Sequence, residues 1–313
     1  MFAYIVRRIL ATIPVMAVVA LFVFSLLYIA PGDPAAVIAG DQATPADVER
    51  IRQSLGLDRP FLVQFGAWVG RLLQGDLGTS IFSHLPVARL IGQRVAPTLA
   101  LTVTTLIIAI VLAIPVGVLA AWRAGTWIDR LVMGWAVCGF SIPVFVLGYL
   151  LIFVFAVQLD WLPVQGYASL DRGFRPFVQS LLLPSFTLGL IYMALIARIT
   201  RASVLEVLAE DYIRTAHAKG LAAVRIVLSH ALKNAAVPIV TVVGVGLTLL
   251  IGGAVITESV FALPGVGRLT VDAILRRDYP IIQGVILLVS GVYVLVNLAV
   301  DVVYTFVDPR VRY

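Results

Sequence analysis

Six long apolar runs constrain this 313-residue chain more than any other feature of its sequence. A hydrocarbon core about 30 Å thick is crossed by about 20 helical residues, and each run is long enough to cross it. The runs cover residues 9–30, 98–121, 131–157, 178–197, 235–261 and 281–307. Backbone in hydrocarbon must satisfy its own hydrogen bonds, and unbroken runs exclude the alternating pattern of a β-barrel. The sequence therefore predicts an all-α membrane protein with six transmembrane helices.

The composition supports the same class of protein. Hydrophobic residues make up 61% of the chain and charged residues 13%, which excludes an ordinary soluble domain. A formal charge of +6 would suggest a nucleic-acid partner in a soluble protein. Here most Arg and Lys lie between the apolar runs, where they orient the chain in its membrane. We therefore expect the lipid bilayer, and no nucleic acid, as a partner.

The distribution of basic residues predicts the orientation. Segments on the side of the N-terminus carry 12 Arg and Lys, whereas the short opposite loops carry five. Loops rich in Arg and Lys stay in the cytoplasm, so both termini of this multi-pass protein should be cytoplasmic in a bacterial inner membrane. The first run exceeds the apolar core of a secretory signal and is interpreted as an uncleaved span.

Proline and small residues mark special positions within the runs. Bends are expected at Pro14, Pro115, Pro143 and Pro184, because proline removes a helical hydrogen bond. A stripe in the fifth run has a small residue at every fourth position, so it should allow another helix to approach closely. The stripe consists of Gly244, Thr248 and Gly252.

Two short helices are predicted in the long loop after the first span. Thr44 and Pro45 form an N-terminal helix signature, and Gly56 provides a stop. Apolar residues at helical spacing between Phe61 and Leu73 then predict an amphipathic helix. Two interpretations of this second helix remain open. It could lie on the membrane or cap a pore, or it could pack against the outer ends of the spans.

Catalytic motifs are missing from the sequence. A phosphate-binding loop needs Gly-Lys-Ser/Thr, but neither Lys219 nor Lys233 follows a glycine. The three histidines lie outside the apolar runs and form no zinc motif. We therefore expect no enzyme activity, no metal site and no cofactor on this chain.

Two carboxylates fall within the apolar runs and are candidates for function because burying them is costly. Glu258 and Asp301 both lie near span ends, so bonding to neighbouring helix groups is favoured over proton relay. Asn297 lies one helical turn before Asp301. This pair is a candidate for the inner pathway or for holding helices together.

The segment between the fourth and fifth spans, residues 198–233, resembles two helices joined at a glycine. The first is predicted over residues 204–219 and ends at Gly220, a natural residue after a helix C-terminus. The second carries an apolar stripe of Val224, Val227, Leu228, Ala231 and Leu232. Such a basic hairpin could dock a protein or rest on anionic lipid.

The same segment carries a known motif. It contains residues 211–221 (DYIRTAHAKGL), followed by residues 231–235 (ALKNA) and Pro238. This pattern resembles the EAA loop of bacterial ABC-importer permeases, in the version found in peptide permeases. The resemblance implies a coupling helix that fits a cleft on an ATPase subunit. Its residues here are Asp211, Tyr212, Arg214, Thr215, Ala216, Ala218, Lys219, Gly220 and Leu221. Arg214-Thr215-Ala216 replaces Glu-Ala-Ala of the general motif, so a carboxylate contact to the ATPase is not assumed.

Further motifs extend the resemblance over nearly the whole chain. They are residues 31–34 (PGDP), 55–60 (LGLDRP), 75–78 (GDLG), 258–268 (ESVFALPGVGR), 277–280 (RDYP) and 308–310 (DPR). Together they resemble the B-type permease subunits of dipeptide, oligopeptide, glutathione and nickel importers. The resemblance implies a type I importer fold with an N-terminal helix (1–30), a periplasmic loop region (31–97) and a core of five spans (98–313).

The family resemblance also implies an assembly and a task. The expected partners are a homologous second permease in a heterodimer, two ATP-binding subunits that hold ATP and Mg, and a periplasmic solute-binding protein. The chain would form half of the pathway for peptides, with di- or oligopeptides expected first. The runner-up hypothesis is a self-sufficient secondary transporter or channel, and a third is a membrane scaffold.

One motif is a candidate outer gate. It comprises Glu258, Phe261, Pro264, Gly265, Gly267 and Arg268, which lie at the end of the fifth span and directly after it. The alternative interpretation is a tight Pro-Gly turn without a gating role.

Overall fold

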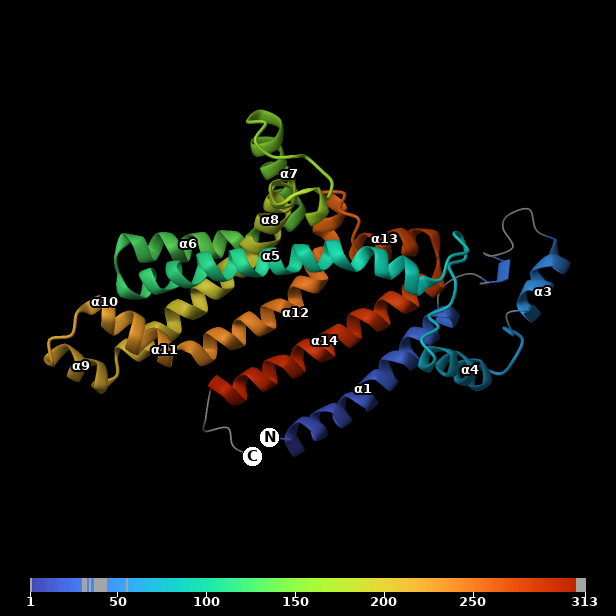
Figure 1. Cartoon of the computed structure of the whole chain (residues 1–313), viewed down its shortest axis with the longest axis horizontal. Helices are drawn as coiled ribbons and strands as arrows, with labels where there is room; N and C mark the ends of the chain where they lie inside the picture. Colours follow the sequence, from blue (N-terminus) through green and yellow to red (C-terminus); the bar gives the residue numbers. More distant parts are fainter. Residues whose placement is uncertain (1, 30–32, 34, 37–43, 55, 308–313) are drawn as a thin grey trace. The chain divides into compact units, whose positions relative to one another are not determined.

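The computed structural model describes residues 2–29, 33, 35–36, 44–54 and 56–307. Outside the described part lie the motif at 308–310 and parts of the motifs at 31–34 and 55–60. Within it, five helices are long and apolar enough to cross a bilayer. They are α1 (Phe2–Ile29), α5 (Val87–Trp122), α8 (Phe174–Leu208), α12 (Ala236–Val260) and α14 (Tyr279–Val307), labelled in Figure 1.

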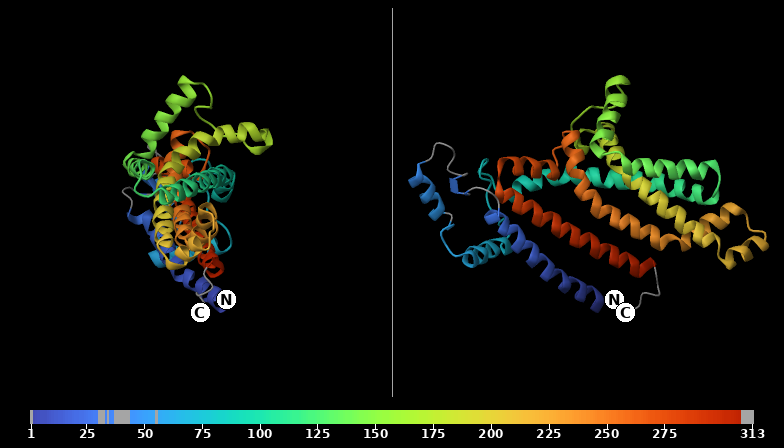
Figure 2. Two further views of the ribbon diagram at one scale, coloured as in Figure 1. Left: turned by 90° about the vertical axis from the view of Figure 1, so that its left-hand side faces the viewer. Right: turned by 180° about the vertical axis from the view of Figure 1, so that it is seen from behind.

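The predicted third span is not one continuous helix. It divides into α6 (Trp127–Ser141), α7 (Val144–Leu151) and a π-helix, η1 (Ile152–Gln158). Pro143 accounts for the break, because proline pushes the preceding residue out of helical conformation. Ile142 accordingly has φ −92° and ψ 123°. Figure 2 shows α7 leaving the direction of α6, so these two helices form a sixth span only as a bent pair. Pro14, Pro115 and Pro184, the other three prolines where bends are expected, lie inside uninterrupted helices.

The chain forms two compact units. Unit 1 comprises Met1–Val95 and Leu269–Leu295, and unit 2 comprises Ala96–Arg268 and Val296–Tyr313. Helices α5, α13 (Val266–Arg276) and α14 each continue from one unit into the other. The division at residues 30 and 97 remains a prediction, since these units follow packing rather than the order of the chain.

Unit 1 contains the two short helices expected in the long loop. They are α3 (Pro45–Ser54) and α4 (Phe61–Leu73), and Gly56 and Gly75 follow them with φ of +67° and +81°. Glycine adopts this left-handed conformation without steric cost.

Helix α4 packs against a span rather than standing apart from it. The Phe24 ring of α1 lies 5.3, 5.5 and 5.4 Å from the rings of Phe61, Phe65 and Trp68. Such aromatic clusters stabilise a contact beyond the area that they bury. Helix α4 therefore makes the packing contact that one interpretation expects, and its position on the membrane or over a pore stays a prediction.

The start of α14 is bound to the segment before α5 in the same unit. Ser80 Oγ donates a 2.6 Å hydrogen bond to the buried Asp278 carboxylate, and the Ile81 amide donates to its other oxygen at 3.3 Å. A Cβ on Gly284 would lie 2.7 Å from a methyl group of Val87, so α14 and α5 touch closely there.

Helix α8 is the central helix of unit 2. Of its most apolar stretch 72% is buried, against 33% or less in the other four long spans. It packs against α6, α7 and α12, and Leu188 and Ile196 contribute to the shared core. A Cβ on Gly253 of α12 would lie only 2.8 Å from Leu188, which shows how closely α8 and α12 approach.

The small-residue stripe of α12 is only partly a packing surface. A Cβ on Gly244 would meet Val300 of α14 at 2.5 Å, as expected for a close helix contact. Gly252 faces open space, and half-buried Thr248 donates to the Val245 carbonyl of its own helix. The close approach is therefore confined to one end of the predicted stripe.

Candidate functional site

The candidate coupling segment begins where α8 ends. Helix α8 runs on to Leu208, and the chain then turns at Ala209 and the extended residue Glu210 into α9 (Asp211–Ala218). The predicted single helix over residues 204–219 is therefore wrong. After the break, Ile213 packs in the loop core with Ala216 and Ile226 at 1% exposure. Burying such a side chain stabilises the turn by about 2 kcal/mol.

Gly220 closes α9 as the sequence predicts. It has φ +77°, and its amide donates to the His217 carbonyl at 2.9 Å. The Leu221 amide donates to the Ala216 carbonyl at 3.3 Å, which completes a Schellman motif. Leu221 and Ala216 belong to one apolar cluster with Ile213 and Ile226, so the turn is fixed from inside.

The second arm of this hairpin departs from the predicted stripe. It consists of α10 (Ala223–Arg225), a π-helix η3 (Ile226–Ala231) and α11 (Leu232–Asn234). Val227 and Ala231 are buried as expected, whereas Val224 and Leu228 are each 54% exposed. Because a π-helix bonds residue i to i+5, it shifts side chains away from the spacing of an α-helix. Ile226, which the stripe omitted, is fully buried.

The outward face of the hairpin carries most of the candidate coupling residues. Asp211, Tyr212, Arg214, Thr215, Ala218, Lys219 and Gly220 are exposed, whereas Ala216 is buried and Leu221 is half-buried. Arg214 forms a 3.1 Å ion pair with Asp211, and Tyr212 Oη accepts a 3.0 Å hydrogen bond from Asn234 of the second arm. The face is therefore polar, charged and open to a partner.

A buried ion pair near this hairpin was missed by the sequence analysis. Arg201 of α8 donates from Nη2 to Asp129 Oδ2 of α6 at 2.7 Å, and its Nε donates to Oδ1. The Gly125 amide donates to Asp129 as well, at 3.0 Å. The only sequence signal was an acidic residue in the first turn of a helix, where it interacts favourably with the helix dipole.

Glu258 lies at the centre of the candidate gate and is fully buried. Thr98 Oγ1 donates to its Oε1 at 2.6 Å, and the Arg268 amide donates to its Oε2 at 2.9 Å. Thr98 Oγ1 also accepts the Val266 amide at 2.8 Å. Thr98 and Glu258 thus satisfy two free amides in the first turn of α13, where a carboxylate is also favoured by the helix dipole.

The rest of the candidate gate is a tightly packed turn. Phe261 is buried, and its carbonyl accepts the Gly166 amide at 3.0 Å. Any side chain on Gly265 would overlap the Glu258 carboxylate, and a Cβ on Gly267 would lie 2.6 Å from Val255 Cα. Pro264 and Arg268 are half-buried. This geometry fits the interpretation as a tight Pro-Gly turn, and a gating role stays a proposal.

The candidate pathway residues lie on α14. Asn297 is half-buried, and Asp301 follows it one turn later; the Asp301 side chain lies outside the described part. Among the described residues no three His, Cys, Asp or Glu side chains are grouped to hold a metal ion.

Comparison with known proteins covers the whole chain. Residues 113–313 match the family of binding-protein-dependent transport system inner membrane components, and residues 1–102 match its N-terminal part. The chain is 54% identical over 310 residues to a probable peptide ABC transporter permease protein of Sinorhizobium fredii, covering 99% of both chains. It is 46% identical over 313 residues to the glutathione transport system permease protein GsiC of Escherichia coli, covering all of both chains.

The fold also matches a solved transporter. An inward-facing structure of the MetNI methionine ABC transporter aligns with a TM-score of 0.59 and 23% identity. The alignment covers 71% of this chain and 97% of that chain. The type I importer fold expected from the sequence is therefore confirmed.

Fold and relatives define the class: a membrane-spanning permease subunit of an ABC importer. The chain belongs to the family of binding-protein-dependent transport system inner membrane components. As a member of it, the chain is a multi-pass inner-membrane protein that works with other transporter subunits.

Proposed function

We propose that this chain forms half of an ATP-driven import pathway for peptides, with di- or oligopeptides as the first candidates. It pairs with a homologous second permease and with two ATP-binding subunits, which hold ATP and Mg. A periplasmic solute-binding protein delivers the substrate. The observation that carries this proposal is the exposed polar face of α9, fixed in one shape by the Gly220 turn.

Two relatives support a peptide as the substrate. One is named a probable peptide permease, and the other transports glutathione, which is itself a short peptide. Peptides and glutathione share a flexible chain of amide groups with charged ends.

The coupling route follows packed contacts within unit 2. Helix α9 is anchored through Ile213 and Ala216 to η3 and to the end of α8. Arg201 of α8 is in turn bonded to Asp129 of α6. A displacement of α9 by closing ATPase subunits would therefore move α8 and α6 together, as rigid helices move in domain transitions.

In this scheme α9 is cytoplasmic and the 258–268 turn faces the opposite side. The two lie at opposite ends of α12, which is 25 residues long and spans about 37 Å at 1.5 Å per residue. That length exceeds the hydrocarbon thickness.

Co-purification tests the assembly directly. The tagged chain is solubilised mildly from native membranes, and its stoichiometric partners are identified by mass spectrometry. We expect a second permease and ATP-binding subunits. Recovery of this chain alone, while a control importer stays assembled, would favour a self-sufficient transporter. That runner-up would then have to transport substrate as the purified chain in liposomes.

A further inference from the structure

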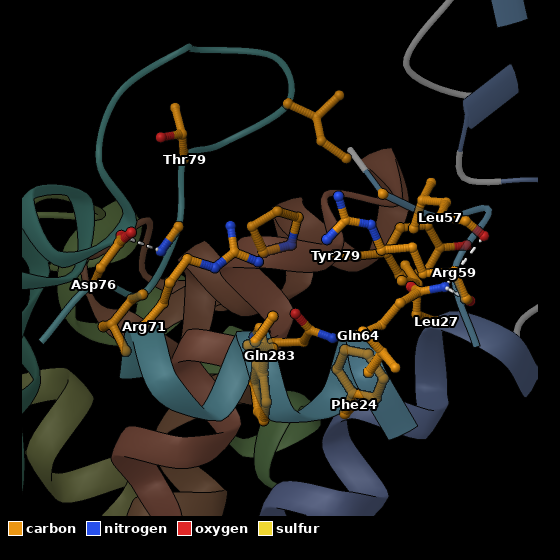
Figure 3. A pocket seen from close by; sticks show the side chains of 18 residues that line it. Phe24, Leu27, Leu57, Arg59, Gln64, Arg71, Asp76, Thr79, Tyr279 and Gln283 are labelled. Carbon is orange, nitrogen blue, oxygen red and sulfur yellow. Dashed lines mark hydrogen bonds between the residues drawn. The ribbon is translucent and has the colours of Figure 1, made fainter. Parts of the chain in front are cut away.

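Unit 1 contains an open cavity of about 420 Å³ that the proposed coupling route does not include. The end of α1, one face of α4, the turns on both sides of α4 and the start of α14 form its wall. Figure 3 shows Arg71 and Asp76 at one end of the cavity and Arg59 at the other. Phe24, Trp68 and Tyr279 supply aromatic surface.

The cavity carries an excess of positive charge. Arg59 and Arg71 reach toward each other across it (Figure 3), and no described carboxylate forms an ion pair with either. Among the described residues that line it Asp76 is the one acidic residue, and Asp76 Oδ1 already accepts the Gly78 amide at 2.8 Å. Two guanidinium groups and one carboxylate give the cavity a net positive charge, which favours binding of an anion.

The position of α4 shows what kind of anion can reach the cavity. Its aromatic face packs on α1, and Ala67 and Arg71 face the cavity. A third face exposes Leu62 and Leu73, whose exposed fractions are 76% and 84%. Exposed leucines on an amphipathic helix beside the end of a span are typical of a helix in the membrane interface. The cavity therefore opens beside lipid headgroups.

We propose that this cavity binds the headgroup of an anionic phospholipid, and that Arg59 and Arg71 donate hydrogen bonds to its phosphate. Guanidinium groups match phosphate oxygens in pairs, and their charge strengthens each hydrogen bond. The half-buried ring of Trp68 and the exposed side chain of Val63 provide the apolar surface along which the glycerol backbone leaves toward the bilayer. Soluble phosphate would meet the same guanidinium groups but would gain nothing from that surface.

The backbone hydrogen bonds of the turn before α4 do not depend on the Arg59 side chain. Gln64 Nε2 donates to the carbonyls of Leu57 and Arg59, at 3.2 and 2.7 Å, and so holds the turn before α4. Neither bond uses the Arg59 side chain. Arg89 provides a matched control, because it is an exposed arginine of α5 outside the cavity.

Native mass spectrometry of the purified full-length chain with its subunits tests the proposal. Short-chain phosphatidylglycerol and phosphatidylcholine are titrated, and inorganic phosphate is added as a competitor. We expect phosphatidylglycerol to bind in preference to phosphatidylcholine. The Arg59→Gln/Arg71→Gln double variant should bind it about tenfold more weakly, whereas Arg89→Gln should bind it normally.

Three results would overturn the proposal. Equal binding of both lipids would remove the role of charge. Displacement by inorganic phosphate at the same concentration as the lipid would make the ligand a soluble phosphate. Unchanged lipid binding in the double variant would show that the two arginines do not bind the lipid, even if the variant lost a soluble protein partner.

If the double variant does not fold, the proposal is tested by the lipid preference and the phosphate competition measured on the wild-type protein. Because lipid binding needs no ATP or peptide, its failure and a failure of import are separable.

Discussion

Arg201 and Asp129 lie 72 residues apart in the chain and meet in a two-point ion pair. Arg201 is on the part of α8 that continues toward the candidate coupling helix, and Asp129 is in the first turn of α6. The Asp129 carboxylate is only 6% exposed and also accepts the Gly125 amide. The pair therefore fastens α6 to the helix that leads into α9.

Breaking this pair should destabilise the protein. Arg201→Gln leaves the buried Asp129 carboxylate without its cation, and we expect a loss of about 2 kcal/mol in the free energy of unfolding. The estimate stays below that of a fully enclosed pair because Arg201 is 25% exposed. Denaturation of the purified protein in detergent measures the change.

The exposed Asp211–Arg214 pair is the matched control. Asp211→Asn removes an ion pair of solvent-exposed side chains, and such pairs contribute little. The free energy of unfolding of Asp211→Asn should equal that of the wild type. Equal stability of Arg201→Gln and Asp211→Asn would contradict a structural role for the buried pair.

Gly220 provides the test of coupling. A β-branched residue at φ +77° is strained by about 1–2 kcal/mol, although no side chain crowds the position. Gly220→Val should therefore insert normally but lower ATP-driven peptide uptake about tenfold relative to ATP hydrolysis. Both rates are measured on the assembled importer in proteoliposomes.

Gly220→Asn separates conformation from size. Asparagine tolerates the left-handed conformation better than other residues with a side chain. It should retain most of the uptake. Normal uptake by Gly220→Val would count heavily against a docking role of this turn.

Gly265 tests the packing of the turn after α12. An alanine methyl group there overlaps the Glu258 carboxylate, so Gly265→Ala should cost about 2–3 kcal/mol of stability through overpacking. Gly252→Ala is the comparison, since that glycine is helical and has open space around it. Its stability should be unchanged or slightly higher. Thermal unfolding of both variants measures the difference, and similar behaviour would argue against the tight turn.

Membrane topology is predicted from the basic residues. A reporter fused near residue 50 or 170 should be active outside, and one near residue 215 or 313 inside, because Arg and Lys remain on the cytoplasmic side. Alkaline phosphatase and fluorescent-protein fusions at matched positions give complementary signals. Reversed signals would place α9 on the wrong side for ATP-binding partners and would refute the coupling scheme.

Local signals in the sequence were sufficient for several elements. The apolar spacing before Gly75 gave the bounds of α4, and Gly220 was identified as the end of α9. Both predictions succeed because helix periodicity and left-handed glycine are properties of short segments. The motif around residues 211–221 also identified the family before any contact was known.

Other features depend on residues that are distant in the chain. The turn at Glu210 exists because Ile213 packs on Ile226, and the π-helix η3 adjusts the second arm to that contact. The bent pair α6–α7 arises at Pro143, which the sequence marked as a bend within one span. Local periodicity cannot distinguish a continuous helix from a broken one when their relative stability depends on side chains buried by tertiary contacts.

The sequence by itself determined that the protein lies in a lipid bilayer, that it is helical and to which family it belongs, because hydrophobicity and motif order are properties of the chain alone. Only the tertiary structure decided which polar groups meet. Thr98 with Glu258, Ser80 with Asp278 and Arg201 with Asp129 are separated by 160, 198 and 72 residues. A buried polar group is stable only when a partner is present, and the partner is supplied by packing rather than by sequence proximity.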